Sequence, residues 1–175
     1  MSAIDLILIT PQLAEALSSP ATCAQQWRVV LDGVIEQVRE VVQAHEVFSQ
    51  RTGAPPQWGG YLACDTGSRQ VIGTCAFKGA PDAAGCVEIA YFTFPAFEGR
   101  GYGGAMAGAL VDKARASGLV RMVAAHTLPA ASASTRILQR LGFTQVGTVI
   151  DDPADGPVWR WELAAAALPG RAAGH

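Results

Sequence analysis

Four glycines fall within six residues at a predicted junction between a strand and a helix. They are Gly99, Gly101, Gly103 and Gly104, and they lie between an apolar run over 85–94 and a helical pattern over about 103–117. Glycine permits a positive φ and lets backbone N–H groups approach a ligand closely. The first turn of a helix adds free N–H donors and a partial positive charge. The junction therefore predicts a cradle for an anion such as a pyrophosphate.

Two common phosphate-binding loops fit this junction poorly. A Walker loop needs Gly-Lys-Ser/Thr, whereas Gly104 is followed by Ala105. The Rossmann pattern G-x-G-x-x-G is matched by Gly99, Gly101 and Gly104, but residues 122–129 lack the carboxylate expected about 20 positions later. A nucleotide-binding oxidoreductase of the Rossmann type therefore stays open only as a less favoured alternative.

The order of elements around the glycines indicates an α/β (α+β) fold with a central mixed, mostly antiparallel sheet of about seven strands flanked by helices. Turn residues between the middle three strands predict an antiparallel meander, and 87–127 predicts a right-handed parallel crossover. A glycine, Gly33, can divide the longest helical region. We expect strands over 4–9, 58–64, 71–77, 85–94, 122–127, 145–150 and 156–163, and helices over 11–17, 25–50, 103–117 and 132–141.

Length and composition favour one soluble domain. The chain has 175 residues, half of them hydrophobic and only 16% charged, which argues against disorder. We expect a single domain over 1–163 and a flexible tail over 164–175. No apolar stretch approaches the ~18–20 residues of a membrane span, and no basic segment precedes an apolar block at the start. A cytoplasmic protein without a membrane partner is expected.

Charge and cysteine usage exclude two further classes. The net charge is -2, with no basic face, so nucleic acid is not an expected partner. No cysteine forms a C-x-x-C pair, and His45, His126 and His175 do not stand at ligand spacing from any, so no metal site is expected. Buried apolar positions are the expectation for the four cysteines, which are Cys23, Cys64, Cys75 and Cys86.

Three motifs in order resemble the GNAT superfamily of acetyl-CoA-dependent N-acetyltransferases. The loop over 98–103, EGRGYG, is similar to the family's Gln/Arg-x-x-Gly-x-Gly/Ala, and it follows a similar strand, VEIAYFT, over 87–93. The segment 127–143 resembles the second motif on the coenzyme A side, which ends in Leu-Gly-Phe. The ending over 152–163 resembles the branch that includes ribosomal-protein N-terminal acetyltransferases. Together the resemblance covers about 58–163.

The resemblance implies acetyl-CoA as the cofactor and an amine acceptor, either a small molecule or a peptide. Backbone groups of the strand would align the pantetheine arm, and the glycine loop would hold the pyrophosphate. Glu98 stands where the family has Gln or Arg, and Ala131 where it commonly has Asn. The implied cofactor-binding residues are Tyr91, Phe92, Thr93, Glu98, Gly99, Arg100, Gly101, Tyr102, Gly103, Gly104, Ala105, Ala131 and Ser134.

Acetyl transfer to an amine needs a base, because only a neutral amine can attack a thioester. Glu88 is a carboxylate inside an apolar strand-like run, so it is a candidate for that base; a solvated or ion-paired glutamate is the alternative. His126 ends the next strand, as a second base or as a hydrogen-bonded neighbour. By resemblance, Ser134 lies near the cofactor sulfur. Leu138 stands where many family members carry a tyrosine acid.

Several features leave both a structural and a functional interpretation open. The aromatic residues of the predicted strands, Trp58, Tyr61, Trp159 and Trp161, suit a core or an acceptor pocket. The acidic turn over 151–155 suits solvent or a cationic amine. We expect region 25–50 to form much of the acceptor wall, in a monomer or homodimer. A non-catalytic acyl-CoA-binding or regulatory domain is the alternative to an enzyme.

Overall fold

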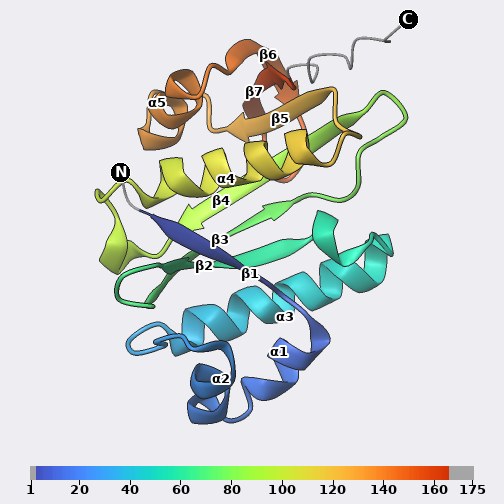
Figure 1. The fold of residues 1–175 in the computed structure, drawn as a ribbon. Helices are drawn as coiled ribbons and strands as arrows, with labels where there is room; N and C mark the ends of the chain where they lie inside the picture. Colours follow the sequence, from blue (N-terminus) through green and yellow to red (C-terminus); the bar gives the residue numbers. More distant parts are fainter. Residues whose placement is uncertain (1–2, 166–175) are drawn as a thin grey trace, which may run out of the picture.

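A computed structural model describes residues 3–165, which form one seven-stranded sheet with helices on both faces (Figure 1). The strand order is β1-β2-β3-β4-β5-β7-β6. Among the seven described strands, only β4 and β5 pair in parallel, so the mixed, mostly antiparallel sheet, the central meander and the parallel crossover are confirmed. The strands are β1 (Ile4–Leu8), β2 (Gly60–Asp65), β3 (Val71–Phe77), β4 (Cys86–Thr93), β5 (Met122–Thr127), β6 (Thr144–Ile150) and β7 (Pro157–Ala164).

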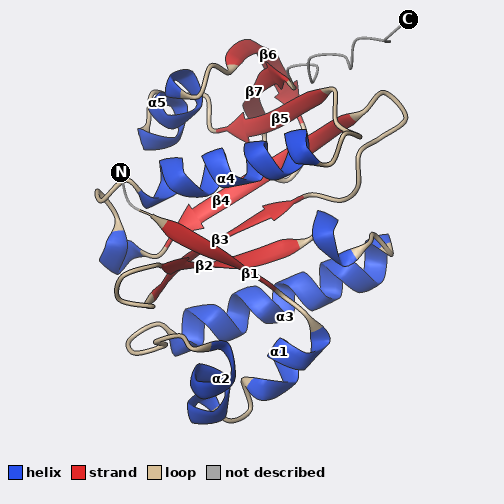
Figure 2. Cartoon of the chain, in the orientation of Figure 1, coloured by secondary structure: helices blue, strands red, loops and turns tan. Residues whose placement is uncertain are grey.

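Helices cover the two faces of this sheet unequally (Figure 2). Three N-terminal helices pack below β1 and β2 in this view, whereas α4 crosses the other face with α5 beside it. The helices are α1 (Pro11–Ala16), α2 (Pro20–Trp27), α3 (Ile35–Thr52), α4 (Tyr102–Ala116) and α5 (Ala133–Arg140), with 3-10 turns η1 (Pro56–Trp58) and η2 (Pro95–Phe97).

The strand β2, second from one edge of the sheet, is buried on both sides. Tyr61 and Ala63 belong to the hydrophobic cluster under α4, and Leu62 and Cys64 belong to the cluster under α1–α3. Side chains of a strand alternate between the faces, so a strand between two helical layers is apolar at nearly every position. This explains why the sequence shows a continuous apolar run there instead of an alternation.

The largest differences from the predicted elements lie before β2. The helical region expected over 25–50 is two helices, and both extend beyond the expected bounds, since α2 begins at Pro20 and α3 ends at Thr52. Gly33 lies in the break with φ +74°, as the glycine suggested. Trp58 was expected on a strand, but it ends η1, which begins with Pro56. Proline supplies no backbone N–H, so the chain turns here before it joins the sheet.

Side-chain capping and a glycine mark two of the helix ends. Thr10 Oγ1 accepts a hydrogen bond from the backbone N–H of Leu13 at 3.2 Å, which caps α1. Gly142 follows α5 with φ +90°, a conformation that glycine adopts without strain. Within residues 3–165, no helix combines the length and apolar character needed to cross a bilayer. Apart from 164–165, the expected tail lies outside the described residues.

The four cysteines are free, and three of them, Cys23, Cys64 and Cys75, are buried as small apolar side chains. Burial raises the pKa of the Cys75 thiol to about 12, so it stays protonated. Cys86 is half-buried, and the Arg160 guanidinium donates to its Sγ at 3.6 Å. The packing role expected for cysteine is therefore met in full at three positions.

Candidate active site

β4 and β5 begin as a parallel pair and then part. Their register has only three steps, the last of which joins Glu88 to Ala124. β4 nevertheless continues to Thr93 and stays paired with β3 along that length. Among the described residues, β5 pairs with β7 on its other side as far as Thr127. A gap therefore opens in the middle of the sheet, directly after Glu88.

The backbone of β4 offers polar groups to this gap. On the side of β3, the backbone carbonyl of Glu88 accepts a hydrogen bond from the N–H of Lys78 at 2.9 Å. The N–H of Phe94 donates to the carbonyl of Ile72 on that same side. Because residues of an antiparallel strand alternate in direction, the even-numbered residues face β3 and the odd-numbered ones face the gap. The backbone groups of Tyr91 and Thr93 thus point into the gap, whereas that of Phe92 points toward β3.

The glycine loop closes around the start of α4. Gly99 and Gly101 have φ of +73° and +83°, in the left-handed region, and Gly101 is the N-cap residue of the helix. The N–H groups of the first turn have no carbonyl partner inside the helix and carry its positive end. A Cβ at Gly103 would lie 2.9 Å from Ile137 Cδ1, so glycine here lets α4 approach α5. The loop thus leaves the backbone N–H groups at the start of α4 without helical partners, and their use as an anion cradle stays a prediction.

A cleft of about 1140 Å³ lies in front of this cradle. Of the residues that the family resemblance assigned to the cofactor, Ala131 is exposed and lines neither this cleft nor the smaller cavity described below, and the others all line the cleft. The sequence reasoning missed Arg136 and Arg140, whose i, i+4 spacing on α5 was the available signal. The further lining residues that it missed are Phe97, Ala133, Ile137 and Leu141.

Two tyrosines fix the walls of the cleft. The Tyr91 hydroxyl donates to the carbonyl of Ser134 at 3.4 Å and so joins β4 to α5. Burial raises the pKa of Tyr91 to about 12, so its hydroxyl keeps its proton near neutral pH. The Tyr102 hydroxyl donates to Asp65 Oδ1 at 2.9 Å, which ties the first residue of α4 to the end of β2.

A second cavity, of about 110 Å³, adjoins the cleft where β4 and β5 part. Tyr91 and Ser134 line both cavities. Side chains alternate across β4, so Glu88 lies on the face opposite to Tyr91. The small cavity thus passes between the parted strands and connects the two faces. Its lining residues are Lys78, Glu88, Ile89, Ala90, Tyr91, Ala125, His126 and Ser134.

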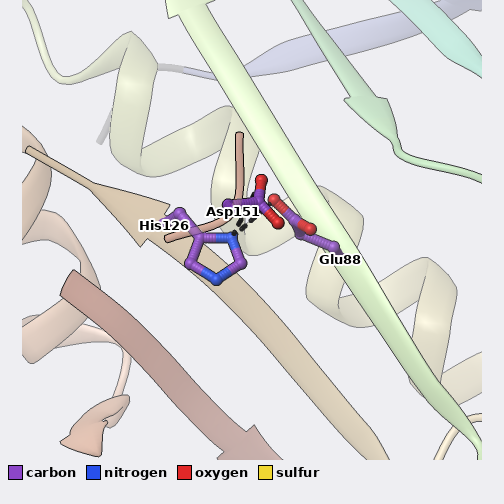
Figure 3. Close-up of side chains that lie close together, drawn as sticks. All are labelled: Glu88, His126 and Asp151. Carbon is purple, nitrogen blue, oxygen red and sulfur yellow. Dashed lines mark hydrogen bonds and ion pairs between the residues drawn. The ribbon is translucent and has the colours of Figure 1, made fainter. Parts of the chain in front are cut away.

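A cluster of four ionisable side chains lies at the far end of the small cavity. Glu88 Oε1 is 2.8 Å from His126 Nδ1 and 2.6 Å from Lys78 Nζ. Asp151, from the loop after β6, has its Oδ2 at 3.5 Å from Lys78 Nζ and at 3.9 Å from His126 Nδ1. Figure 3 shows how Glu88, His126 and Asp151 point toward one another. The His126 side chain is only 8% exposed, and its Nε2 has no hydrogen-bond partner within residues 3–165.

Sequence reasoning missed Lys78 and left Asp151 between solvent and a cationic amine. Lys78 is one of only two lysines in the chain, and the predicted hairpin between 71–77 and 85–94 was the signal that could have placed it opposite Glu88. Burial acts to lower the pKa of Lys78, but the hydrogen bond that its ammonium donates to Glu88 and the charges of Glu88 and Asp151 outweigh it and raise the pKa. Lys78 is therefore a bound ammonium.

The same cluster contains a possible set of metal ligands. One ligand atom from each of Glu88, His126 and Asp151 lies within 4.8 Å of the others. The Lys78 ammonium, however, contacts the Glu88 oxygen that a metal ion would use. A cation of the chain itself therefore already lies beside the Glu88 carboxylate, and the absence of a metal site stays a prediction from the sequence.

Residues 6–144 match the family described as acetyltransferase (GNAT) domain. The chain belongs to this family. As a GNAT acetyltransferase it transfers an acetyl group from acetyl-CoA to an amine. No curated protein matches the chain in sequence.

Solved structures resemble this GNAT acetyltransferase over almost its whole length. RimL, a ribosomal L7/L12 alpha-N-protein acetyltransferase in complex with coenzyme A, has a TM-score of 0.65 and 20% identity, covering 94% of this chain and 95% of that one. An acetyl transferase from Salmonella typhimurium that modifies the N-terminal serine of L7/L12 has 0.64 and 18%, covering 94% and 96%. A GNAT-family acetyltransferase from Bacillus anthracis has 0.64 and 14%, covering 95% and 98%. These likenesses show the fold.

The tryptophans of the GNAT acetyltransferase pack in its core and line neither cavity. The Trp161 indole N–H donates to Thr127 Oγ1 at 3.0 Å, and the ring meets that of Trp159 edge-on at 6.5 Å. Trp58 meets Phe77 edge-on at 5.0 Å. None of the residues of region 25–50 lines either cavity, and the acceptor wall expected from that region stays a prediction.

Proposed function

We propose that the GNAT acetyltransferase binds acetyl-CoA in the large cleft and the acceptor amine in the small cavity, with Glu88 as the general base. One observation carries this proposal. The small cavity shares Tyr91 and Ser134 with the cleft, and it is also lined by the pair formed by Glu88 and His126. A thioester carbonyl near Ser134 would thus lie on the path of an amine that contacts Glu88.

Charge and backbone direction support the orientation of acetyl-CoA. The N–H groups at the start of α4, from Tyr102 to Ala105, suit the pyrophosphate, and Arg136 and Arg140 add positive charge on the opposite wall. The odd-numbered backbone groups of β4 suit the amides of the pantetheine arm. Backbone binding of this kind does not depend on the side chain at 98, so Glu98 can replace the usual Gln or Arg without removing the cradle.

Glu88 is well placed to take a proton from the attacking amine. Free alkylamines and α-amines have pKa values of roughly 8–10, so most of the acceptor arrives as an ammonium ion. Glu88 would accept one proton, directly or through a water molecule, and the neutral nitrogen would attack the thioester carbon. A backbone N–H of β4 facing the gap would stabilise the oxyanion. The departing thiolate needs no strong acid, since a thiol has a pKa near 8.5.

His126 acts in this proposal through Glu88. Its Nδ1 contacts the carboxylate at 2.8 Å, and its ring is almost fully buried. A neighbour held in this way fixes the orientation of the carboxylate and can pass on the proton. Ser134 takes a place at the junction of the two cavities, where its hydroxyl can contact the cofactor sulfur.

We propose the N-terminal amine of a peptide as the acceptor, ahead of a small-molecule amine. Two structural relatives, which acetylate a ribosomal protein at its N-terminus, support this choice. The carboxylates of Glu88 and Asp151 favour a cationic amine over a neutral one. The cytoplasmic location, and activity as a monomer or homodimer, are retained as proposals.

The test is thiol release from acetyl-CoA with matched acceptors. A short peptide beginning with serine, the same peptide blocked at its α-amine, and a set of small primary amines are compared, with acetyl-CoA binding measured by calorimetry. We expect turnover of the free peptide and none of the blocked one. Binding of acetyl-CoA without turnover of any amine would instead favour the non-catalytic alternative.

A further inference from the structure

We propose that Lys78 is itself an acetyl acceptor, so that the enzyme acetylates its own chain from acetyl-CoA bound in the cleft. This inference rests on the proposed function, because it needs the thioester to lie near Ser134. Its starting point is that an amine of the chain already lies where the acceptor amine is expected. Lys78 Nζ is 2.6 Å from Glu88 Oε1, the atom proposed to take the proton.

The cavity brings Lys78 close to the reacting end of the cofactor. Lys78, Tyr91 and Ser134 all line the same cavity of about 110 Å³, whose size allows only a few water molecules between them. The lysine side chain is a flexible stem of four carbons, and it is 43% exposed. The proposed transfer requires Nζ to move only within this one cavity.

The reaction balances without any further reactant. The Lys78 ammonium gives one proton to the Glu88 carboxylate, and the neutral Nζ attacks the carbonyl carbon of the thioester. A C–N bond forms and the C–S bond breaks, which leaves an amide on Lys78. The second nitrogen proton passes to the departing sulfur to give the free thiol of coenzyme A, and Glu88 releases its proton to solvent.

Acetylation would change the charge at the acceptor end of the cavity. The ammonium of Lys78 is the cation that contacts both Glu88 and Asp151. As an amide it could no longer pair with them, and the two carboxylates would then face an incoming cationic amine alone. Self-acetylation would thus convert the site from one that holds its own lysine to one that favours an external ammonium ion.

The chain provides its own control, because it has only one other lysine. Lys113 is exposed on α4, lies over the ring of Tyr61 and lines neither cavity. Spontaneous acetylation by acetyl-CoA would modify Lys113 at least as readily as the ion-paired Lys78. A preference for Lys78 would therefore indicate transfer within the site.

The experiment incubates the full chain with deuterated acetyl-CoA and maps the labelled peptides by mass spectrometry. Thiol release to the peptide acceptor is measured on the same preparation. We expect Lys78 to be labelled at least ~10-fold faster than Lys113, because its amine is held beside the thioester. The first-order rate constant for labelling of Lys78 should be independent of protein concentration, as for transfer within one chain. Lys78→Arg should remove the label, and Lys113→Arg should leave it unchanged.

The outcomes separate this inference from the proposed function. Turnover of the peptide with Lys78 unlabelled, or labelled no faster than Lys113, overturns self-acetylation and leaves the function standing. No binding of acetyl-CoA overturns both. The fraction of Lys78 and of Lys113 that is already acetylated in the isolated protein is measured by the same mass spectrometry, and the two fractions are compared.

Discussion

The carboxylate of Glu88 contacts the ring of His126 at 2.8 Å, and these residues come from the two strands that part directly beyond them. Glu88 belongs to the last residue pair between β4 and β5, and His126 lies two residues after Ala124, the β5 member of that pair. The polar pair therefore lies where backbone pairing between the strands ends. This coincidence makes the parting of the strands and the chemistry of the site one feature of the fold.

Replacing Glu88 by glutamine should reduce kcat by about 10²–10⁴-fold, because the amide cannot accept the amine proton. The KM for acetyl-CoA should stay unchanged, since the cradle lies on α4. Steady-state kinetics with the peptide acceptor measure both values. Glu36→Gln, an exposed carboxylate on α3 that lines neither cavity, is the matched control and should keep full activity. An unchanged kcat for Glu88→Gln across pH would remove Glu88 from the role of base.

Replacing Gly101 by alanine should weaken coenzyme A binding by roughly tenfold, about 1.4 kcal/mol. Its φ of +83° strains an alanine, so the loop would relax and turn N–H groups away from the phosphates. Isothermal titration measures the affinity. Gly79→Ala is the control, because Gly79 also has a positive φ, +103°, but lies in a turn that lines neither cavity. Equal losses of affinity in both variants would contradict a local role for Gly101.

Replacing Gly73 by alanine should destabilise the fold by about 1–3 kcal/mol through overpacking. The added Cβ would clash with the backbone oxygen of Phe92 and lie 3.2 Å from Met106 Cε, so β3 and β4 could not keep their spacing. Urea unfolding measures the change. Gly108→Ala in α4 meets only Leu141, at 3.8 Å, and should stabilise the fold by about 0.5–1 kcal/mol through helix propensity. A neutral effect at Gly73 would show that the strands can move apart.

Asp65 should contribute pH-dependent stability. Its pKa is lowered, first by the backbone N–H of Ser68 and then by the hydroxyls of Tyr102 and Ser68, with a smaller part from the N–H of Gly67. A lowered folded pKa means that the stabilisation is present above the unfolded value of 3.8 and is lost as the pH falls through the folded value.

The measurement compares unfolding of the wild type and Asp65→Asn between pH 7 and pH 3. Their difference should be largest at neutral pH and should shrink in acid. Asp112→Asn, which removes an exposed carboxylate on α4, controls for net charge. A difference that stays constant over this range would refute the assignment.

The fold was predictable because its signals are local. The strand over 71–77 and the strand over 122–127 were predicted with the bounds that the structure gives them. The glycines marked the start of α4 within one residue, and Gly142 marked the end of α5. In contrast, the insertion of β7 between β5 and β6 depends on contacts distant in sequence, and no local pattern indicates it.

The candidate site was predictable in part, for the same reason. Glu88 and His126 each stood out within a single strand, so sequence reasoning found them. The full cluster draws on a hairpin end at Lys78 and a loop at Asp151, which are 73 positions apart (151 minus 78). Only the tertiary structure brings such residues together, and long polar side chains in turns otherwise look like solvent-exposed ones.

The parting of β4 and β5 leaves an unfinished ladder in the middle of the protein. The backbone groups of Ile89, Tyr91 and Thr93 that would have paired with a neighbouring strand are directed toward whatever occupies the space. A ligand built of repeated amides can complete that ladder as a strand would. These backbone groups of β4 are thus hydrogen-bonded only while a ligand lies in the gap. The rigidity of the sheet is therefore coupled to each round of substrate binding and product release.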